Sequence, residues 1–206
     1  MLFHAPNRIA ILRAAMKLFA SGGHETTTVA NIVREAGVTL DTFYRYFVGK
    51  DELARVLYGD LLRERDAYIA EPPREDASLQ EQFLFLWMRM VKFAIEFPDA
   101  MGFLERYEER FHNDEELEPP DAPPLLIERI ELLTRARIAK DEPPLVLAAL
   151  VWGALMQLLK LHRRGESRLT EAQVVSAGQC CLDAISRPRA RTAPDNSVTG
   201  TRILPQ

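Results

Sequence analysis

Apolar side chains recur at helical spacing along almost the whole chain, and no segment alternates apolar and polar residues for long enough to predict a strand. Three short stretches of this kind occupy the first 50 residues, and longer, more apolar stretches follow. The pattern predicts an all-α protein of about nine helices. We expect these helices at residues 7–20, 29–36, 39–47, 50–70, 78–97, 99–111, 125–139, 144–162 and 170–186.

Capping residues and helix breakers mark the ends of these helices. Thr28 can cap the second helix, Gly37 can take the left-handed conformation that ends it, and Thr39 can cap the third. Pro72 and Pro73 end the fourth helix because proline lacks the N–H group that a helix needs. The turn between the second and third helices is therefore short and contains a glycine.

Three later segments have a distinct composition. The helix predicted at 78–97 is apolar on almost every face, which is typical of a central helix surrounded by others. Residues 112–124 are acidic and rich in proline, which predicts an exposed loop. Residues 187–206 are polar and interrupted by prolines, so we expect a flexible C-terminal tail.

The overall charge hides a difference between the two parts of the chain. The 206 residues contain 26 Lys and Arg against 30 Asp and Glu, a net charge of −4, and 47% are hydrophobic, as in a globular protein. Residues 1–50 have six basic and three acidic side chains, a net charge of +3, whereas the remainder has 20 basic and 27 acidic, a net charge of −7. This asymmetry favours contact between nucleic acid and the N-terminal part.

Cysteine content and hydropathy suggest a cytoplasmic protein. Cys180 and Cys181 are adjacent, form no spacing suited to zinc, and are interpreted as structural core residues. Residues 1–6 lack the pattern of a signal peptide, and the longest uncharged apolar stretch, 145–159, is shorter than the roughly 20 residues that cross a bilayer. We expect no metal site and no cofactor.

Residues 28–47, TVANIVREAGVTLDTFYRYF, fit a helix-turn-helix motif. Both short helices have an apolar inner face, where we place Phe43 and Phe47. The second presents hydroxyl, aromatic and guanidinium groups outward, which can reach phosphates or base edges in a DNA major groove. Helical hairpins also serve purely structural roles, so the geometry alone leaves DNA binding open.

The amino-acid sequence of residues 8–53 resembles that of the N-terminal domain of the TetR family of bacterial transcriptional regulators. The shared features are LFASGG before the second helix, TTV, the AGV turn, TFYRYF in the third helix and KDEL at the start of the fourth. Asp41 departs from the family pattern, which usually has a small residue there, and His24 stands where an aromatic ring is common. Asp41 would repel phosphate but can accept a hydrogen bond from a cytosine amino group, while His24 is expected to pack against its own domain.

The resemblance implies a division into a helix-turn-helix DNA-binding domain, residues 1–50, and a ligand-binding and dimerisation domain, residues 51–186, before the tail. It implies DNA contacts at Thr28, Thr39, Thr42, Tyr44, Tyr46 and Lys50, to which the pattern adds Leu40, Asp41 and Arg45. Thr28 and Thr39 can instead be helix caps only. Leu40 can meet a thymine methyl group or be an ordinary exposed apolar residue.

The resemblance also implies that the C-terminal helices form a homodimer and enclose a pocket for a small effector. For the dimer we choose the helices at 144–162 and 170–186, where Ala177, Gly178 and Cys181 would let helices approach closely. An intramolecular core is the alternative for these residues. We expect the pocket to be lined by Phe85, Trp87, Met88, Arg89, Met90, Phe93, Met101, Phe103, Leu104 and Tyr107, although each of them also suits ordinary core packing.

These features together predict a dimeric repressor that binds double-stranded DNA at a palindromic operator and is released by a small apolar or aromatic effector. A helical enzyme is disfavoured because the four histidines are scattered and Glu105, Glu108 and Glu109 look like a solvated helix face. A helical module that binds a partner or small molecule without binding DNA is the remaining alternative, which Asp41 and the modest positive charge keep open.

Overall fold

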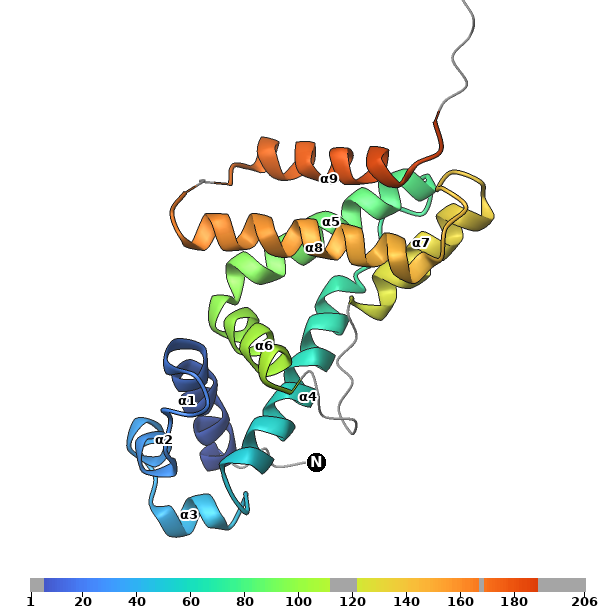
Figure 1. The fold of residues 1–206 in the computed structure, drawn as a ribbon. Coiled ribbons are helices and arrows are strands. Elements are labelled where there is room, and N and C mark those ends of the chain that lie inside the picture. The colour runs from blue at the N-terminus through green and yellow to red at the C-terminus, as the bar shows by residue number, and fades with distance from the viewer. Residues whose placement is uncertain (1–5, 112–121, 167–168, 189–206) are drawn as a thin grey trace, which may run out of the picture.

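The structure, a computed structural model, describes residues 6–111, 122–166 and 169–188. Within these ranges it contains nine α-helices and no strand, so the predicted all-α fold is confirmed (Figure 1). The helices are α1 (Pro6–Gly22), α2 (Val29–Ala36), α3 (Leu40–Tyr44), α4 (Lys50–Ile69), α5 (Leu79–Glu96), α6 (Pro98–Phe111), α7 (Pro124–Arg135), α8 (Pro144–Arg163) and α9 (Glu171–Ile185).

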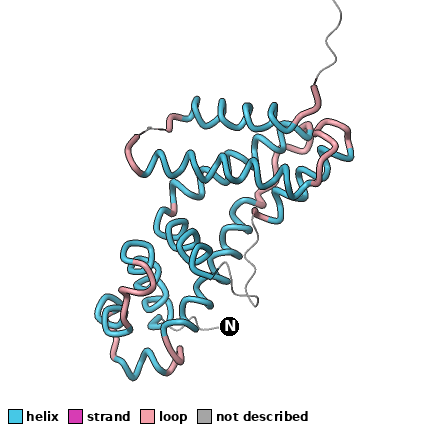
Figure 2. Tube along the Cα trace, in the orientation of Figure 1, coloured by secondary structure: helices cyan, strands magenta, loops and turns pink. Residues whose placement is uncertain are grey.

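The helices form two groups, which we call the head (α1–α3) and the body (α5–α9). The long helix α4 begins at the head and ends in the body, where it packs against α5 and α6 (Figures 1 and 2). Helix α1 lies along α6, so the head contacts the body through this helix pair as well as through α4. A change in the α1–α6 contact would therefore change how the head is held.

Helix α5 is the centre of the body, as its apolar sequence predicts. It packs against α4, α6, α7, α8 and α9. Its first turn is fixed by a capping box, in which the Ser78 hydroxyl accepts from the Glu81 N–H and the Glu81 carboxylate accepts from the Ser78 N–H. Further along, the indole N–H of Trp87 donates to the Val174 carbonyl at 2.9 Å, which joins α5 to α9.

The close approach of α5 and α9 depends on Gly178. A Cβ atom at this position would lie 2.6 Å from Cδ1 of Trp87, closer than atoms in contact can be. Val174 and Leu182, one turn before and one turn after, are also buried. The small residues of α9 were predicted to serve a dimer, but Gly178 serves the intramolecular core instead, because the indole ring of α5 needs the space.

Two helices are shorter than the sequence pattern predicts. Helix α3 ends at Tyr44 rather than at residue 47, since the Phe43 carbonyl accepts from the N–H groups of both Tyr46 and Phe47 in a tight turn. Helix α7 ends at Arg135 rather than at residue 139. Residues 138–140 instead run antiparallel to residues 185–187, with hydrogen bonds of 2.8 Å at each end of a single β-bridge, and an extended pairing of this kind excludes a helix.

Residues 112–121 of the predicted acidic loop lie outside the described residues, and its last residue, Pro124, begins α7. Residues 189–206 of the predicted tail also lie outside them. The expectation that both cysteines are core residues is wrong for Cys180, which is exposed. Cys181 is half-buried and packs against the core.

Candidate nucleic-acid interface

Two capped helices and a left-handed glycine form the predicted helix-turn-helix. The hydroxyl of Thr28 accepts from the Asn31 N–H at 3.2 Å and caps α2. Gly37 then adopts φ 67°, ψ 31°, a conformation that side chains disfavour, and ends α2. The hydroxyl of Thr39 accepts from the Thr42 N–H at 3.2 Å and caps α3. Both threonines are therefore helix caps, and a DNA contact by either of them stays a prediction.

Buried rings fix the orientation of α3. Phe43 is fully buried and Phe47 is 3% exposed, and their ring centroids lie 5.8 Å apart. Ile32 and Val33 of α2 belong to the same core. The inward placement of the two phenylalanines is thus confirmed. With these rings inside the head, the opposite side of α3 must point away from the protein.

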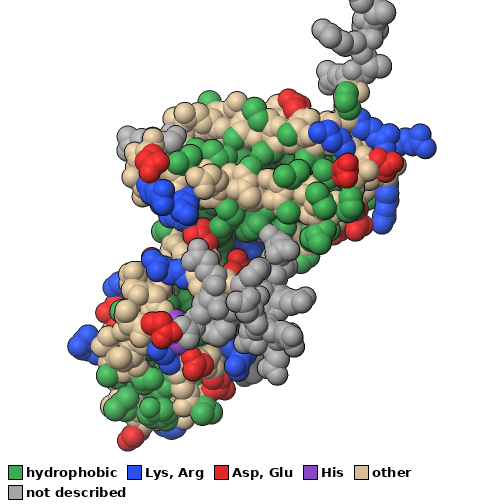
Figure 3. Space-filling model, in the orientation of Figure 1, with side chains coloured by type: hydrophobic (Ala, Val, Ile, Leu, Met, Phe, Trp, Pro, Cys, Tyr) green, Lys and Arg blue, Asp and Glu red, His purple; other side chains and the backbone are tan. Residues whose placement is uncertain are grey.

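Leu40 and Tyr44 project from that outer side of α3, and Val48 is exposed in the short connection between α3 and α4. Leu40 is 49% exposed, Tyr44 is 57% exposed and Val48 is 86% exposed. Asp41 and Arg45 are exposed beside them. We call Leu40, Tyr44 and Val48 the outer stripe. Figure 3 shows hydrophobic side chains gathered at the end of the head that carries α3. An apolar strip with one phenol group suits thymine methyl groups and phosphate oxygens.

Not all predicted contact residues are free to reach a ligand. Thr42 is 8% exposed, and its hydroxyl lies 2.9 Å from that of Thr39 and accepts from the Arg45 guanidinium at 3.1 Å. Thr42 therefore supports α3 and positions Arg45. Tyr46 is half-buried, with its ring against Phe47. The structure thus brings Leu40, Asp41, Tyr44 and Arg45 to the outer side but turns Thr42 inward.

Lys50 lies at the beginning of α4 and ties two segments of the head together. Its ammonium donates to the His24 carbonyl at 2.8 Å. The His24 ring stacks on Phe19 at a centroid distance of 5.3 Å, and its Nε2 lies 2.9 Å from the Asp51 carboxylate, so His24 packs against its own domain as expected. Gly49 supplies no side-chain cap, so backbone N–H groups and an ammonium meet at one helix N-terminus, an arrangement that suits phosphate.

An ion pair joins α1 to α2 on the surface of the head. The Lys17 ammonium lies 2.6 Å from the Glu35 carboxylate. The hydrogen bond and the charge of Lys17 lower the pKa of Glu35, and Glu35 in turn raises the pKa of Lys17. Both side chains are exposed to water, so the pair adds orientation between the two helices rather than much stability.

The side chains predicted to line an effector pocket do not gather around one cavity. Seven of the ten are buried in the core: Trp87, Met90, Phe93, Met101, Phe103, Leu104 and Tyr107. Arg89 is held by the Tyr68 carbonyl and by Glu71, and Phe85 and Met88 are half-buried. Phe93 lines a cavity beside α4, and Phe103 and Tyr107 line another beside His24. Core packing, the alternative for each residue, accounts for the four buried residues that line neither cavity: Trp87, Met90, Met101 and Leu104.

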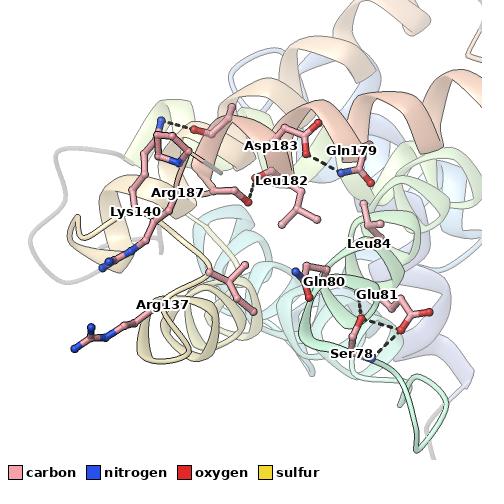
Figure 4. Close-up of a pocket in the computed structure, with 14 residues that line it drawn as sticks. Ser78, Gln80, Glu81, Leu84, Arg137, Lys140, Gln179, Leu182, Asp183 and Arg187 are labelled. Carbon is pink, nitrogen blue, oxygen red and sulfur yellow. Dashed lines mark hydrogen bonds between the residues drawn. The ribbon is translucent and has the colours of Figure 1, made fainter. Parts of the chain in front are cut away.

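A hollow of about 1240 Å³ lies where the first turn of α5, the α7–α8 connection and the end of α9 meet (Figure 4). Several of its polar side chains already have protein partners. Gln179 donates to Asp183 at 2.8 Å, Lys140 donates to the Ala184 carbonyl at 2.6 Å, and Glu81 belongs to the capping box of α5. The polar groups of Gln179, Lys140 and Glu81 are therefore engaged within the protein.

Helices α8 and α9 each leave an apolar face uncovered. Leu145 and Val146 are 50% exposed and Leu150 is 63% exposed on α8, and Val175 is 48% exposed on α9. Figure 3 shows hydrophobic side chains across this side of the body. Among the described residues, α8 is also the one helix long and apolar enough to cross a membrane, by length and composition alone, and 28% of its apolar window is buried. An uncovered apolar surface of this kind marks a contact site.

Two family models together match nearly the whole described chain. The model of "Bacterial regulatory proteins, tetR family" matches residues 11–57. The model of "Tetracyclin repressor-like, C-terminal domain" matches residues 59–187, more than half of the sequence. The chain belongs to the TetR family. It is therefore a transcriptional regulator with a helix-turn-helix DNA-binding domain, not an enzyme.

Individual proteins are also similar to this chain in sequence or in fold. The HTH-type transcriptional regulator HbdR of Aromatoleum sp. (strain CIB) is 41% identical over 68 residues, which cover 33% of this chain and only 28% of HbdR. The fold resembles the crystal structure of a TetR-family regulator from Marinobacter aquaeolei VT8 (TM-score 0.76, 18% identity, 89% and 97% of the two chains covered). It also resembles one from Haemophilus influenzae (TM-score 0.75, 19% identity, 91% and 100% covered).

Sequence reasoning missed one member of the outer stripe. Val48 is the most exposed large apolar residue of this TetR-family head, and no prediction was made for it. A usable signal was present, since Val48 directly precedes Gly49 in the short connection to α4, and such connections run over the protein surface.

Proposed function

We propose that this regulator is a repressor that binds a palindromic operator as a homodimer and leaves it when a small apolar or aromatic effector binds the body. The observation that carries the proposal is the outer stripe, held outward by the buried rings of Phe43 and Phe47. An α3 of five residues spans only a few base pairs, so tight and selective binding requires two heads on two half-sites. We place the protein in the cytoplasm, where its operator would be.

The proposed contacts divide by chemistry. Leu40 meets a thymine methyl group, and Asp41 accepts from a cytosine amino group. Tyr44 and Arg45 reach phosphates or base edges from the same side of α3. Thr28, Thr39 and Lys50 lie at helix N-termini, where phosphate oxygens bind well. Tyr46, which is half-buried, and Thr42, which is buried, contribute by holding these groups in place.

The proposed dimer joins α8 and α9 of one protomer to the same helices of its partner. The uncovered face of α8 includes Val146, Leu150 and Gly153, and that of α9 includes Ala172 and Val175. A two-fold axis brings identical patches together, so each apolar residue covers surface on the partner. Four helices packed in this way form a bundle, which gives the exposed α8 a cover.

The proposed effector site is in the body, near α5. Tyr68, Phe93 and Phe97 surround the cavity of about 400 Å³ beside α4, and aromatic walls of this kind suit an apolar or aromatic molecule. Because α4 and α6 both connect this region to the head, a bound molecule can alter the distance between the two heads of a dimer.

Selection from a random pool of DNA duplexes followed by binding titrations tests this function. Wild-type protein should recover a palindromic motif, and Tyr44→Ala should weaken binding to it by about 1–3 kcal/mol. Lys50→Ala should lower the slope of log K against log salt by about 2 for a dimer, since each protomer loses one phosphate contact.

Lys140→Ala is the matched control for Lys50→Ala. Lys140 also donates to a backbone carbonyl, that of Ala184 at 2.6 Å, but it lies in the body. Its replacement should leave both the affinity and the salt slope unchanged. If Tyr44→Ala and Lys50→Ala bind as wild type does, the proposed docking is wrong. If wild-type protein binds no duplex, the chain is instead the partner-binding module that was the alternative.

A further inference from the structure

The cavity beside α4 lies at the junction of the head and the body. Its volume is about 400 Å³, and its walls come from α1, from α4 and from the corner where α5 ends and α6 begins. Met16 is the wall residue from α1, and Leu61 and Tyr68 are among those from α4. A molecule in this cavity would touch the DNA-binding head and the body at once.

Three aromatic rings form one wall of this cavity. The Tyr68 and Phe93 centroids are 5.6 Å apart with an interplanar angle of 60°, and those of Tyr68 and Phe97 are 5.7 Å apart at 84°. Phe93 and Phe97 are 5.3 Å apart. Phe97 is 45% exposed, so part of its ring faces the solvent. Because neighbouring rings are tilted against each other, more than one of their electron-rich faces can be directed toward the cavity.

The charged residues that line the cavity are all acidic. They are Glu64, Glu96 and Asp99, and no Lys, Arg or His lines it. The Glu96 carboxylate accepts from the Tyr68 hydroxyl at 2.7 Å, which fixes it beside the aromatic wall. The Lys92 ammonium approaches Glu96 at a longer distance, 3.7 Å, and its own side chain is 57% exposed. The cavity therefore combines apolar walls with an excess of negative charge.

One ring of the aromatic wall, that of Tyr68, already binds a cation of the protein itself. The guanidinium carbon of Arg89 lies 3.9 Å from the centroid of the Tyr68 ring. Its charge is matched by Glu71, whose carboxylate is 2.8 Å away. A cation against an aromatic face with a carboxylate beside it is thus an arrangement that this part of the protein forms with its own residues.

We propose that this cavity binds an organic cation with an aromatic or apolar body, whose charged group lies between the Tyr68 and Phe97 rings and the carboxylates of Glu96 and Asp99. The proposal rests on the proposed function, in which an effector binds near α5, and narrows the effector from apolar molecules in general to cationic ones. A neutral molecule would gain no charge attraction from these carboxylates, and an anion would be repelled by them.

The position of the cavity also gives the ligand a route to the head. Met16 lies one residue before Lys17, which pairs with Glu35 of α2. The head shares one core, in which Ile11 of α1, Ile32 of α2 and Phe43 of α3 are fully buried, so it moves as a unit. A ligand that separates α1 from the α5–α6 corner must move α3 with it, and it favours the conformation in which the cavity is wider.

Isothermal titration calorimetry on the full chain tests the site without DNA. The probe is benzyltrimethylammonium, and phenylmethanesulfonate, an anion of similar size and the same ring, is the control ligand. The cation should bind at least about tenfold more tightly than the anion. Glu96→Gln, which can still accept from the Tyr68 hydroxyl, and Phe97→Leu, which keeps an apolar side chain but loses the π-face, should each weaken cation binding about fivefold.

Glu142→Gln removes an exposed carboxylate from the α7–α8 connection and should leave cation binding unchanged. Thermal unfolding checks that each variant is folded, as expected for residues as exposed as Glu96 and Phe97. Equal binding of cation and anion overturns the proposal, and so does unchanged cation binding by both Glu96→Gln and Phe97→Leu.

A second measurement separates this proposal from the proposed function. The selected operator duplex is titrated with wild-type protein, with and without the cation. Release of the operator by the cation supports both. If the protein binds the operator equally well with and without the cation, the cation is not the effector, but the DNA-binding function stands. If the protein binds no operator at all, the proposed function is wrong, and the calorimetry alone decides whether the cation site exists.

Discussion

The exposed apolar face of α8 makes the proposed dimer testable with one substitution, Leu150→Glu. Leu150 lies in the middle of α8 and is 63% exposed in the single chain, so a charged residue there should not disturb the fold. Surface substitutions away from special features usually change stability by less than about 0.5 kcal/mol. In a two-fold dimer, however, the same residue would be buried on both protomers.

The expected loss follows from that exposure. Complete burial of a leucine side chain contributes about 1.5–3 kcal/mol, and roughly two thirds of this remains to be gained at Leu150, or about 1–2 kcal/mol for each copy. Two copies give about 2–4 kcal/mol, which corresponds to a dissociation constant raised roughly 30- to 700-fold. Burial of two carboxylates beside each other adds to this loss.

Sedimentation velocity over a range of protein concentrations measures the dimer, and thermal unfolding of the same samples reports on the fold. Ile95→Glu is the matched control, because Ile95 is 44% exposed but lies on α5. Leu150→Glu should dissociate into folded monomers that bind the operator weakly, and Ile95→Glu should remain dimeric. A Leu150→Glu protein that stays dimeric at every concentration, or an Ile95→Glu protein that dissociates equally, would refute a dimer through α8.

Three further outcomes follow from the local geometry. Gly178→Ala places a Cβ 2.6 Å from Trp87 and should lower the free energy of unfolding, measured in urea, by about 1–3 kcal/mol. In the control Gly59→Ala the Cβ meets only the Arg63 guanidinium at 3.8 Å, so the free energy of unfolding should rise by up to about 1 kcal/mol. Equal stability of the two variants would contradict the packing of Gly178 against Trp87. Gly37→Ala strains a residue at φ 67° by about 1–2 kcal/mol and should speed hydrogen exchange in α2 and α3 while the body exchanges as before. Hydrogen bonds from the Ser78 backbone and hydroxyl lower the pKa of Glu81. The stabilisation from these bonds is therefore present above the ordinary pKa of 4.5 and is lost as the pH falls through the lowered pKa. The difference in melting temperature between wild type and Glu81→Gln should shrink from pH 7 to pH 3, and a constant difference would exclude this linkage.

The head was predictable because its determinants are local. Thr28 and Thr39 cap the helices that directly follow them, and Gly37 adopts its left-handed conformation within three residues of both helices. Phe43 and Phe47 point inward because of their spacing on one helix and the turn after it. Each of these features can be read within a window of about ten residues, and all of them agree with the family pattern.

The body was less predictable because its determinants are distant in sequence. Helical periodicity shows that α5 is apolar on most faces, but it does not show which partner each face meets. Trp87 looked suitable for an effector pocket, and only the position of Gly178 on α9 turns it into a core residue. For the same reason, we expected the close contact of α9 at Gly178 to be made with a partner protomer rather than with α5 of the same chain.

Charge partners were also hidden from the sequence. Glu105 and Glu108 looked like a solvated helix face, yet Glu105 accepts from the Arg163 guanidinium at 2.6 Å and Glu108 accepts from the Tyr58 hydroxyl at 3.3 Å. These partners come from α8 and α4, about 50 residues or more away in sequence. A regular spacing of carboxylates on one helix says nothing about the basic residues and hydroxyl groups that other helices bring to them.

The hydrogen bond from Lys50 to the His24 carbonyl also affects the entropy of DNA binding. A free lysine side chain loses up to about 2 kcal/mol of rotamer entropy when it is fixed on a partner. In this protein the carbonyl already holds the four-carbon stem in place, and an ammonium has three N–H groups, so two remain for a phosphate oxygen. The ordering of Lys50 is therefore completed during folding. A head with few positive charges can gain affinity from a charge that is in position before the DNA arrives.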